Sequence, residues 1–176
     1  MVKIQSWRDI PTPLGRFRLA IDADGGLHGG WHHVGQLPSG GQKDPALEPD
    51  LVAWIEASMR GRVEPPPPFR IPTGSDFFTA CWKACRSIPP GTVWSYLELA
   101  RSAGRPTAHR AAGAAMRHNP CPLFVPCHRV VRSDGQLGGF AGRTNPQDAA
   151  LGLKTNLLKL ENSLDDLGRV RGILCR

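Results

Sequence analysis

The chain has 176 residues, of which 40% are apolar, and its formal net charge is +7; this length fits one domain or two small ones, and the apolar content supports a buried core. No stretch approaches the roughly 18 apolar residues of a membrane helix, and no signal-peptide pattern is present at the N-terminus. The five cysteines are irregularly spaced, which argues against a disulfide framework and for a reducing compartment. The basic excess suits a polyanionic partner, although charge alone does not establish one.

A run of four prolines, Pro65 to Pro68, is the clearest boundary in the chain. Consecutive prolines favour an extended, semi-rigid conformation and exclude a helix or a central strand. We therefore expect two domains. Residues 1–68 form an N-terminal domain that ends in the proline-rich linker, and residues 69–176 form a C-terminal domain.

Before the prolines, the pattern predicts a small α/β domain with an antiparallel sheet. Thr12 to Gly15 is typical of a turn, Arg16 to Ile21 alternates as a strand, and Leu27 to His33 is expected to return as its hairpin partner. One amphipathic helix follows, because apolar residues recur at helical spacing. These residues are Leu51, Trp54, Ile55 and Met59.

The C-terminal domain is expected to begin with a helix. Gly74-Ser75-Asp76 is a typical helix start, and the run from Ile88 to Gly91, with its two prolines and a glycine, ends the helix. Cys81 and Cys85 fall on its apolar face, so we interpret them as core residues rather than ligands.

Two short helices with a glycine-containing turn then predict a helix-turn-helix. Ser95 and Glu98 match a capping box that opens the first of them. Thr107 is expected to cap the second helix, which runs from Ala108 to Arg117. A last helix is predicted from about Leu151 to Glu161.

The most informative motif is Pro126-Cys127-His128-Arg129, which lies in the apolar run from Leu123 to Val131. A thiol is followed directly by an imidazole. A thiolate is a strong nucleophile once a neighbouring base or charge lowers the pKa of its thiol. A reactive cysteine beside a DNA-reading element narrows the chemistry considerably.

The segment from Ile88 to Gly142 resembles O6-alkylguanine-DNA alkyltransferases, also called methylated-DNA–protein-cysteine methyltransferases. Four stretches carry the resemblance, with spacings that fit without a gap: Ile88 to Tyr96, Gly104 to Ala111, Met116 to Pro120, and the cysteine run through Val131. The resemblance implies an α+β fold, with a small N-terminal α/β domain and a mostly helical, winged helix-turn-helix C-terminal domain.

The resemblance also implies a reaction and its catalytic residues. Cys127 attacks the alkyl carbon on O6 of a damaged guanine and keeps the alkyl group as a thioether, so the protein acts once. His128 matches the family's base and is expected to reach the thiol through a water. Glu161 matches the acid that orients this histidine and raises its basicity.

Two further residues complete the predicted catalytic set. Asn119 resembles a residue that organises the helix-turn-helix against the active-site turn, and it also suits a helix C-terminus before Pro120. Tyr96, the only tyrosine, resembles a phenol that donates a hydrogen bond or proton to the departing guanine.

Arg110 matches the family's intercalating arginine, which implies binding in the minor groove with the target guanine rotated out of the duplex. That rotation costs a few kcal/mol of unpairing and unstacking, which a planar guanidinium in the gap partly offsets. Small neighbours let a helix approach a narrow groove, and equally permit close helix packing. These neighbours are Ala108, Ala111, Ala112, Gly113 and Ala114. Arg117 and Arg132 are candidate phosphate contacts.

The resemblance assigns a substrate pocket as well. Val130 and Ala141 are expected to offer backbone groups to the guanine edge, and Phe140 and Tyr96 to form aromatic walls. The chain departs from the family pattern here, because Ala141-Gly142-Arg143 stands where a Gly-Gly pair is common. The pocket rim, and with it the preference between methyl and bulkier adducts, is expected to differ.

We expect no metal and no cofactor. Some relatives hold zinc through N-terminal cysteine and histidine, but this chain has no cysteine before Cys81, and its N-terminal histidines lack a thiol partner. These histidines are His28, His32 and His33.

Three other functions compete with alkyl transfer. An alkyltransferase-like protein would bind the lesion without accepting the alkyl group, but such proteins replace the acceptor cysteine. A winged-helix regulator would leave the Cys-His pair, Tyr96 and Glu161 without a role, and nothing signals the oxyanion hole of a cysteine hydrolase. The expected partner is double-stranded DNA that contains O6-alkylguanine, bound by a monomer away from membranes. The expected location is the cytoplasm and nucleoid of a prokaryote or the nucleus of a eukaryote.

Overall fold

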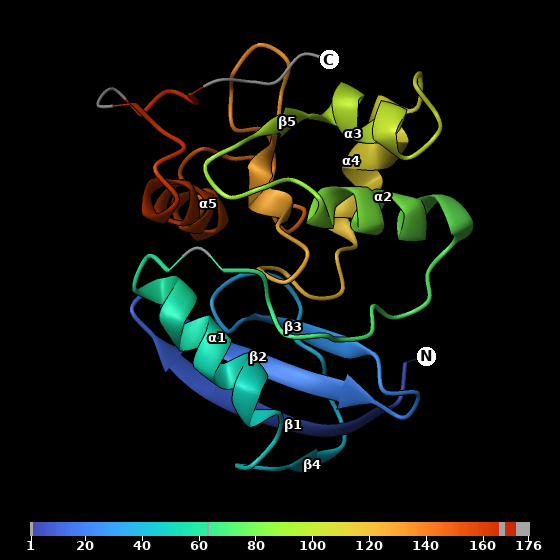
Figure 1. Ribbon diagram of the computed structural model, residues 1–176, viewed down its shortest axis with the longest axis vertical. Coiled ribbons are helices and arrows are strands. Elements are labelled where there is room, and N and C mark those ends of the chain that lie inside the picture. Colours follow the sequence, from blue (N-terminus) through green and yellow to red (C-terminus); the bar gives the residue numbers. More distant parts are fainter. Residues whose placement is uncertain (1, 63, 166–167, 172–176) are drawn as a thin grey trace. The chain divides into compact units, whose positions relative to one another are not determined.

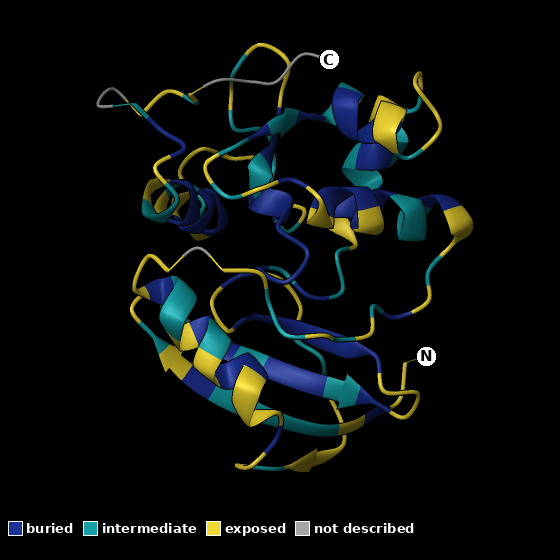
Figure 2. Cartoon of the chain, viewed as in Figure 1, coloured by how far each residue is buried: buried dark blue, intermediate teal, exposed yellow. Residues whose placement is uncertain are grey.

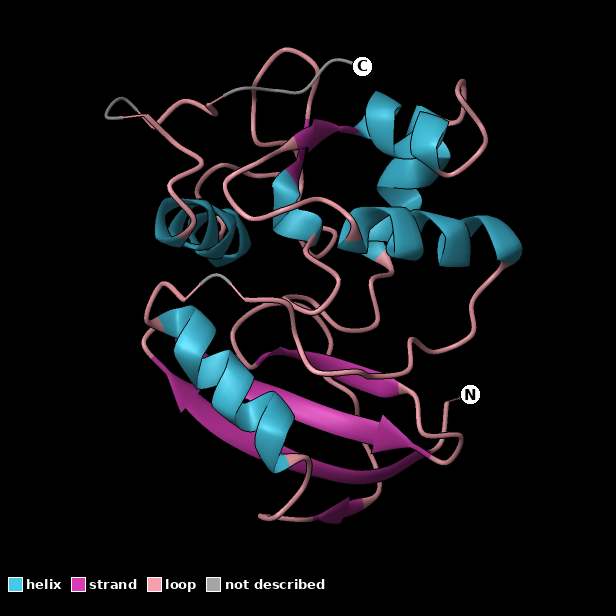
Figure 3. Cartoon of the chain, in the orientation of Figure 1, coloured by secondary structure: helices cyan, strands magenta, loops and turns pink. Residues whose placement is uncertain are grey.

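The computed structural model describes residues 2–62, 64–165 and 168–171. The chain forms two compact units, Met1–Thr73 and Gly74–Arg176, so the observed division follows Thr73, whereas the prediction placed it after Pro68. The α+β class predicted from the sequence is confirmed, because the first unit holds a four-stranded sheet with one helix and the second holds helices and a two-stranded sheet (Figures 1 and 3). No helix within the described ranges has the length and apolar content needed to cross a membrane.

The first unit is built on a four-stranded sheet with the order β3-β2-β1-β4. Its strands are β1 (Ile4–Thr12), β2 (Gly15–Asp22), β3 (Leu27–Trp31) and β4 (Gln42–Lys43). The first three are antiparallel neighbours, as predicted for β2 and β3, but β4 runs parallel to β1. The sheet is therefore mixed rather than antiparallel, because the chain passes from the β3 edge to the opposite edge before it adds β4.

Strand β1 was not predicted, and its burial explains why. Only Ile4 and Ile10 of its nine residues are buried. The strand therefore lacks the strict alternation of apolar and polar residues that marks a half-buried strand in a sequence.

One helix, α1 (Pro49–Met59), covers a face of this sheet (Figure 1) and confirms the predicted amphipathic helix. Buried and exposed residues alternate along this helix in Figure 2, and the buried ones are Leu51, Val52, Ile55 and Met59. In the core of the unit, the rings of Phe17 and Trp31 meet edge to face, with 4.8 Å between their centroids. Trp54 is half-buried, and its indole Nε1 donates to the Glu64 carbonyl at 2.8 Å.

The second unit begins with α2 (Asp76–Arg86), followed by β5 (Trp94–Ser95) and α3 (Tyr96–Ser102). Both predicted helix starts are confirmed. Ser75 accepts from the Phe78 amide at 3.3 Å. Ser95 and Glu98 form a complete capping box, with the Glu98 carboxylate accepting from the Ser95 amide at 2.7 Å.

The second helix of the predicted pair is α4 (His109–Arg117), but Thr107 does not cap it. A turn closes first, because the Ala108 amide donates to the Arg105 carbonyl at 3.0 Å. Ala108 therefore becomes the residue before the helix and offers no side-chain cap. The helix packs against α2, where the Trp82 indole donates to the Ala115 carbonyl at 2.9 Å.

The rest of the second unit surrounds the cysteine motif. A 3-10 turn, η1 (Cys127–Arg129), leads into β6 (Val130–Val131), which pairs in parallel with β5. The last helix, α5 (Ala149–Leu160), begins two residues before its predicted start, because Asp148 caps it by accepting from the Ala150 amide at 2.9 Å.

Candidate functional site

Cys127 lies at the start of the η1 turn and lines a cavity of about 690 Å³. Its amide donates to the Val125 carbonyl at 2.7 Å, which holds the turn tight. The residue is only 5% exposed, but its contact with the cavity gives a ligand a route to it. Cavities of this size hold small organic ligands, so the cavity has room for a purine.

His128 follows in the same turn and is fully buried. Its Nε2 lies 3.0 Å from Oε1 of Glu161. Burial alone would raise the pKa of Glu161, but the charges and hydrogen bonds of His128 and Arg129 lower it to about 2. The carboxylate therefore has no proton to give, so Nε2 is the donor and Nδ1 of a neutral ring is a free acceptor.

Burial also decides the charge of the imidazole. It lowers the pKa of His128 against the opposing attraction of Glu161. Nδ1 is buried and has no hydrogen-bond partner within the described part of the chain. A neutral imidazole whose Nδ1 lone pair is available is what a general base requires.

Arg129 supports the same carboxylate. Its Nη2 lies 2.7 Å and its Nε 2.9 Å from the two oxygens of Glu161, and its Nη1 donates to the Ile88 carbonyl at 2.6 Å. The predicted pairing of His128 with Glu161 thus has a second cation behind it, which keeps Glu161 ionised while the histidine remains neutral.

Asn119 connects the end of α4 to the cysteine turn. Its Nδ2 donates to the Val125 carbonyl at 2.7 Å, and its Oδ1 accepts from the Cys121 amide at 3.0 Å. Burial raises the pKa of the Cys127 thiol, while a hydrogen bond from Asn119 and the charge of Lys154 oppose that rise. One side chain therefore fixes the turn and favours the thiolate.

Lys154 is a residue of the site that the sequence analysis missed. It is fully buried on α5, and its ammonium donates to the carbonyls of Val130 at 2.6 Å, Leu137 at 2.5 Å and Gly139 at 3.3 Å. Burial lowers its pKa to about 8, although the neighbouring sulfurs of Cys127 and Cys85 oppose this shift. A lysine on the apolar face of the last helix was the available signal.

The structure brings Tyr96, Phe140 and Ala141 to the wall of the cavity, but not Val130. The Val130 carbonyl, predicted to meet the guanine edge, instead accepts from Lys154. The Tyr96 hydroxyl donates to the Gly139 carbonyl at 3.4 Å. Burial, with a smaller contribution from the neighbouring sulfurs of Cys127 and Cys85, raises the pKa of Tyr96 to about 12, so the phenol keeps its proton at neutral pH.

The unusual rim sequence forms a tight turn. The Phe140 amide donates to the Arg143 carbonyl at 2.9 Å, and the reverse bond measures 2.8 Å. Ala141 and Gly142 between them have positive φ angles of 48° and 78°. The φ angle of 78° at Gly142 favours glycine, and a Cβ atom there would lie 3.0 Å from Nε of Arg117, so that side chain would have to shift slightly.

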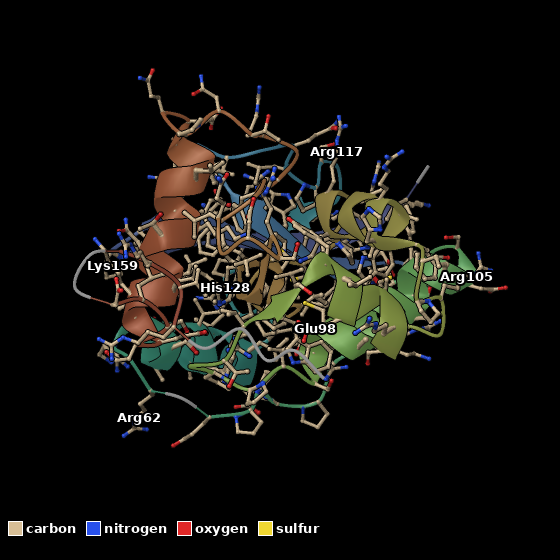
Figure 4. All side chains as sticks on the ribbon, turned by 90° about the horizontal axis from the view of Figure 1, so that it is seen from above. Arg62, Glu98, Arg105, Arg117, His128 and Lys159 are labelled. Carbon is tan, nitrogen blue, oxygen red and sulfur yellow. The ribbon has the colours of Figure 1, made fainter. Side chains whose placement is uncertain are left out.

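The candidate DNA-binding residues lie along α4. Arg110 is exposed, and Gly113 and Arg117 line the cavity. Residues at these spacings share one face of a helix, so Arg110 lies one turn from the cavity wall. Ala108, Ala111 and Ala114 are half-buried on the same helix or at its start. Arg105 and Arg117, both labelled in Figure 4, are exposed, whereas His128 is fully buried.

The basic charge is concentrated in one unit. Residues 74–176 hold 14 of the 22 basic side chains and 7 of the 15 acidic ones, so the whole formal charge of +7 belongs to the second unit. Arg132, the other predicted phosphate contact, is exposed, lines the cavity and pairs with Asp134 at 2.8 Å. A polyanion is attracted to the unit that contains Cys127.

No group of three or more metal-ligating side chains occurs in the ranges that the structure describes. Two of the three N-terminal histidines contact carboxylates: His28 lies 2.8 Å from Asp22, and His32 lies 2.9 Å from Asp9. Cys81 and Cys85 are buried in the core, as predicted.

Comparisons with known proteins agree with this geometry. Residues 76–163 match the family described as 6-O-methylguanine DNA methyltransferase, DNA binding domain. The chain is 34% identical to a methylated-DNA–protein-cysteine methyltransferase of Methanosarcina barkeri, over 88% of this chain and 95% of that protein. A mouse protein of the same name is 35% identical over 76% of this chain and 72% of its own length. The crystal structure of Mycobacterium tuberculosis OGT in complex with DNA has a TM-score of 0.77 and 32% identity, covering 90% of this chain and 93% of that one.

Proposed function

Because the chain belongs to the family of methylated-DNA–protein-cysteine methyltransferases, we propose that it repairs DNA by moving the alkyl group of O6-alkylguanine irreversibly to Cys127. The observation that carries this proposal is a single constellation. A thiol lines a cavity of about 690 Å³, and the adjacent neutral imidazole is oriented by an ionised carboxylate.

The transfer is a displacement at the alkyl carbon. His128 takes the thiol proton at Nδ1, through a water, and the thiolate of Cys127 forms the new carbon–sulfur bond as the carbon–oxygen bond breaks. The electron pair of the broken bond stays with guanine, and the phenol of Tyr96 donates a hydrogen bond or a proton to the departing base. The thioether has no further leaving group, so each molecule reacts once.

Lys154 assists by electrostatics. Its ammonium favours the ionised form of Cys127, since an opposite charge close to a buried group stabilises the charged state. It also holds the backbone from Val130 to Gly139 through three carbonyls. We assign it a positioning role that spans β6 and the loop that follows.

The DNA interface is the exposed face of α4. The chain binds DNA through its basic second unit, and we propose that this helix enters the minor groove. The target guanine then leaves the duplex for the cavity, and Arg110 fills the gap. Arg117 and Arg132 bind phosphates beside it.

One assay tests the function directly. The protein is incubated with a duplex that contains O6-methylguanine and is then weighed by mass spectrometry with peptide mapping. The thiol hydrogen of Cys127 should be replaced by one methyl group, and Cys127→Ala should bind the lesion without gaining mass. Cys85 and Cys121, which are buried free thiols of the same unit, serve as internal controls and should stay unmodified. Tight binding by an unmodified wild-type protein would instead establish a lesion-binding function.

A further inference from the structure

The segment after α5 forms a small hairpin whose described residues are Ser163–Asp165 and Gly168–Arg171. The Asp165 amide donates to the Arg169 carbonyl, and the Arg171 amide donates to the Ser163 carbonyl, both at 2.8 Å. Most of this hairpin lies beyond residue 163, where the family match ends. The predicted function gave this segment no role.

The hairpin is anchored to the core of the second unit. Leu164 is 7% exposed and packs with Val93, Val131 and Leu158, and Val170 packs against the same cluster. The Arg169 amide donates to Oδ1 of Asp165 at 2.7 Å, which fixes the backbone at the arginine. Binding through Arg169 therefore does not require the ordering of a free tail, which would weaken it.

The hairpin reaches the reaction cavity. Gly168 and Arg169 line the same cavity as Cys127 and Tyr96. Three further arginines line it from separate segments, and no acidic side chain does so in the described part of the chain. These arginines are Arg117, Arg132 and Arg143.

The arginines differ in how far their charge is already neutralised. Arg132 pairs with Asp134 at 2.8 Å, and Arg143 lies 3.9 Å from Asp148. Across the described ranges, neither Arg117 nor Arg169 has a carboxylate oxygen within 4.0 Å of its guanidinium. These two guanidinium groups are therefore the ones most open to an external anion.

We propose that the hairpin is a second DNA-binding element, in which Arg169 binds a backbone phosphate beside the rotated nucleotide. This inference depends on the proposed function, because a guanine in the cavity leaves its sugar and phosphates at the opening. Guanidinium groups bind phosphate oxygens through paired, charge-assisted hydrogen bonds. Arg117 on α4 and Arg169 on the hairpin then hold the damaged strand from two separate segments.

The test compares Arg169→Gln with Lys159→Gln. Lys159 is an exposed cation on α5 that does not line the cavity, so its variant removes the same charge elsewhere. Both are made in the Cys127→Ala background, and binding to a duplex with O6-methylguanine is measured by fluorescence anisotropy at several salt concentrations. Arg169→Gln should weaken binding about tenfold and reduce the slope of log K against log salt by about 0.9, the value for one phosphate. Lys159→Gln should leave the slope unchanged. Arg169→Lys, which keeps the positive charge, should retain most of the wild-type slope.

A second readout separates this inference from the function itself. In the Cys127-containing protein, Arg169→Gln should slow the reaction with duplex DNA much more than the reaction with free O6-benzylguanine, because that base carries no phosphate. An unchanged salt slope, or an equal loss of reaction with the free base, would overturn the phosphate role of Arg169. A wild-type protein that accepts an alkyl group from neither substrate would overturn the proposed function instead.

Discussion

Replacing Glu161 with glutamine removes one negative charge and almost no volume. The carboxylate has two partners, Nε2 of His128 at 3.0 Å and the guanidinium of Arg129 at 2.7 to 3.2 Å. The side-chain oxygen of glutamine can accept a hydrogen bond from one of these two donors. Its NH2 group then faces the other donor and cannot accept from it. The substitution therefore leaves a guanidinium without its counter-charge in a largely buried position, which is strongly destabilising.

The pKa of Glu161 sets the expected size of the effect. It falls from 4.5 to about 2 on folding, against the opposing contribution of burial. Because each unit corresponds to 1.36 kcal/mol, the ionised carboxylate contributes about 3 kcal/mol to the stability of the wild-type protein at pH 7. The folded-state pKa is depressed, so this contribution is complete above pH 5 and is lost as the pH falls toward 2. At pH 3, about 1.4 kcal/mol should remain.

Urea unfolding followed by circular dichroism measures the difference between wild type and Glu161→Gln at the two pH values. Carboxyl groups that do not interact with Glu161 titrate alike in both proteins and cancel from the difference. The gap should narrow from about 3 kcal/mol at pH 7 to about 1.4 kcal/mol at pH 3. A gap of equal size at both pH values would show that Glu161 acts through packing rather than charge, and would refute the reasoning.

Three further substitutions probe the remaining parts of the site. Arg110→Ala should lower the repair rate of duplex DNA at least tenfold more than the rate with a free guanine-based substrate, as measured by single-turnover kinetics; equal losses would exclude intercalation. Lys154→Met should slow reaction with the free substrate about tenfold at pH 7. This loss of rate should shrink above pH 8, where the wild-type lysine itself loses its charge. A loss of rate that does not depend on pH would leave Lys154 with a structural role only. Ala141→Gly should raise the free energy of unfolding by up to about 1 kcal/mol, because alanine at a φ of 48° is strained; a destabilised variant in urea unfolding would contradict this.

Local signals in the sequence predicted the helices whose ends are fixed by nearby side chains. Ser75 and the Ser95–Glu98 pair satisfy amides within three residues of themselves, so their effect needs no tertiary context. Thr107 has the right chemistry, but the turn at Arg105–Ala108 moves the start of α4 past it. A pattern of residue types cannot show where such a turn closes.

The missed residues of the site depend on contacts between distant segments. Lys154 meets carbonyls that lie 15 to 24 positions away in the chain, and Arg169 reaches the cavity only because Leu164 anchors the hairpin in the core. The fold class followed from the alternation of apolar residues and the resemblance to a family. The partners of a buried ammonium follow from the path of the backbone, which local patterns do not encode.

The surroundings of Cys127 combine two opposing effects, and their balance explains how a protein that reacts once can keep its nucleophile intact. Burial raises the pKa of the thiol, so the resting sulfur is mainly protonated and poorly reactive toward oxidants, which attack the thiolate. Lys154 and Asn119 make ionisation less costly, and the neutral ring of His128 provides an acceptor for the proton. A base that fills the cavity excludes bulk water and strengthens the attraction between Lys154 and the thiolate. The thiol of Cys127 is therefore activated when the substrate base fills the cavity. While the cavity is open to solvent, the thiol stays protonated and is protected from oxidants.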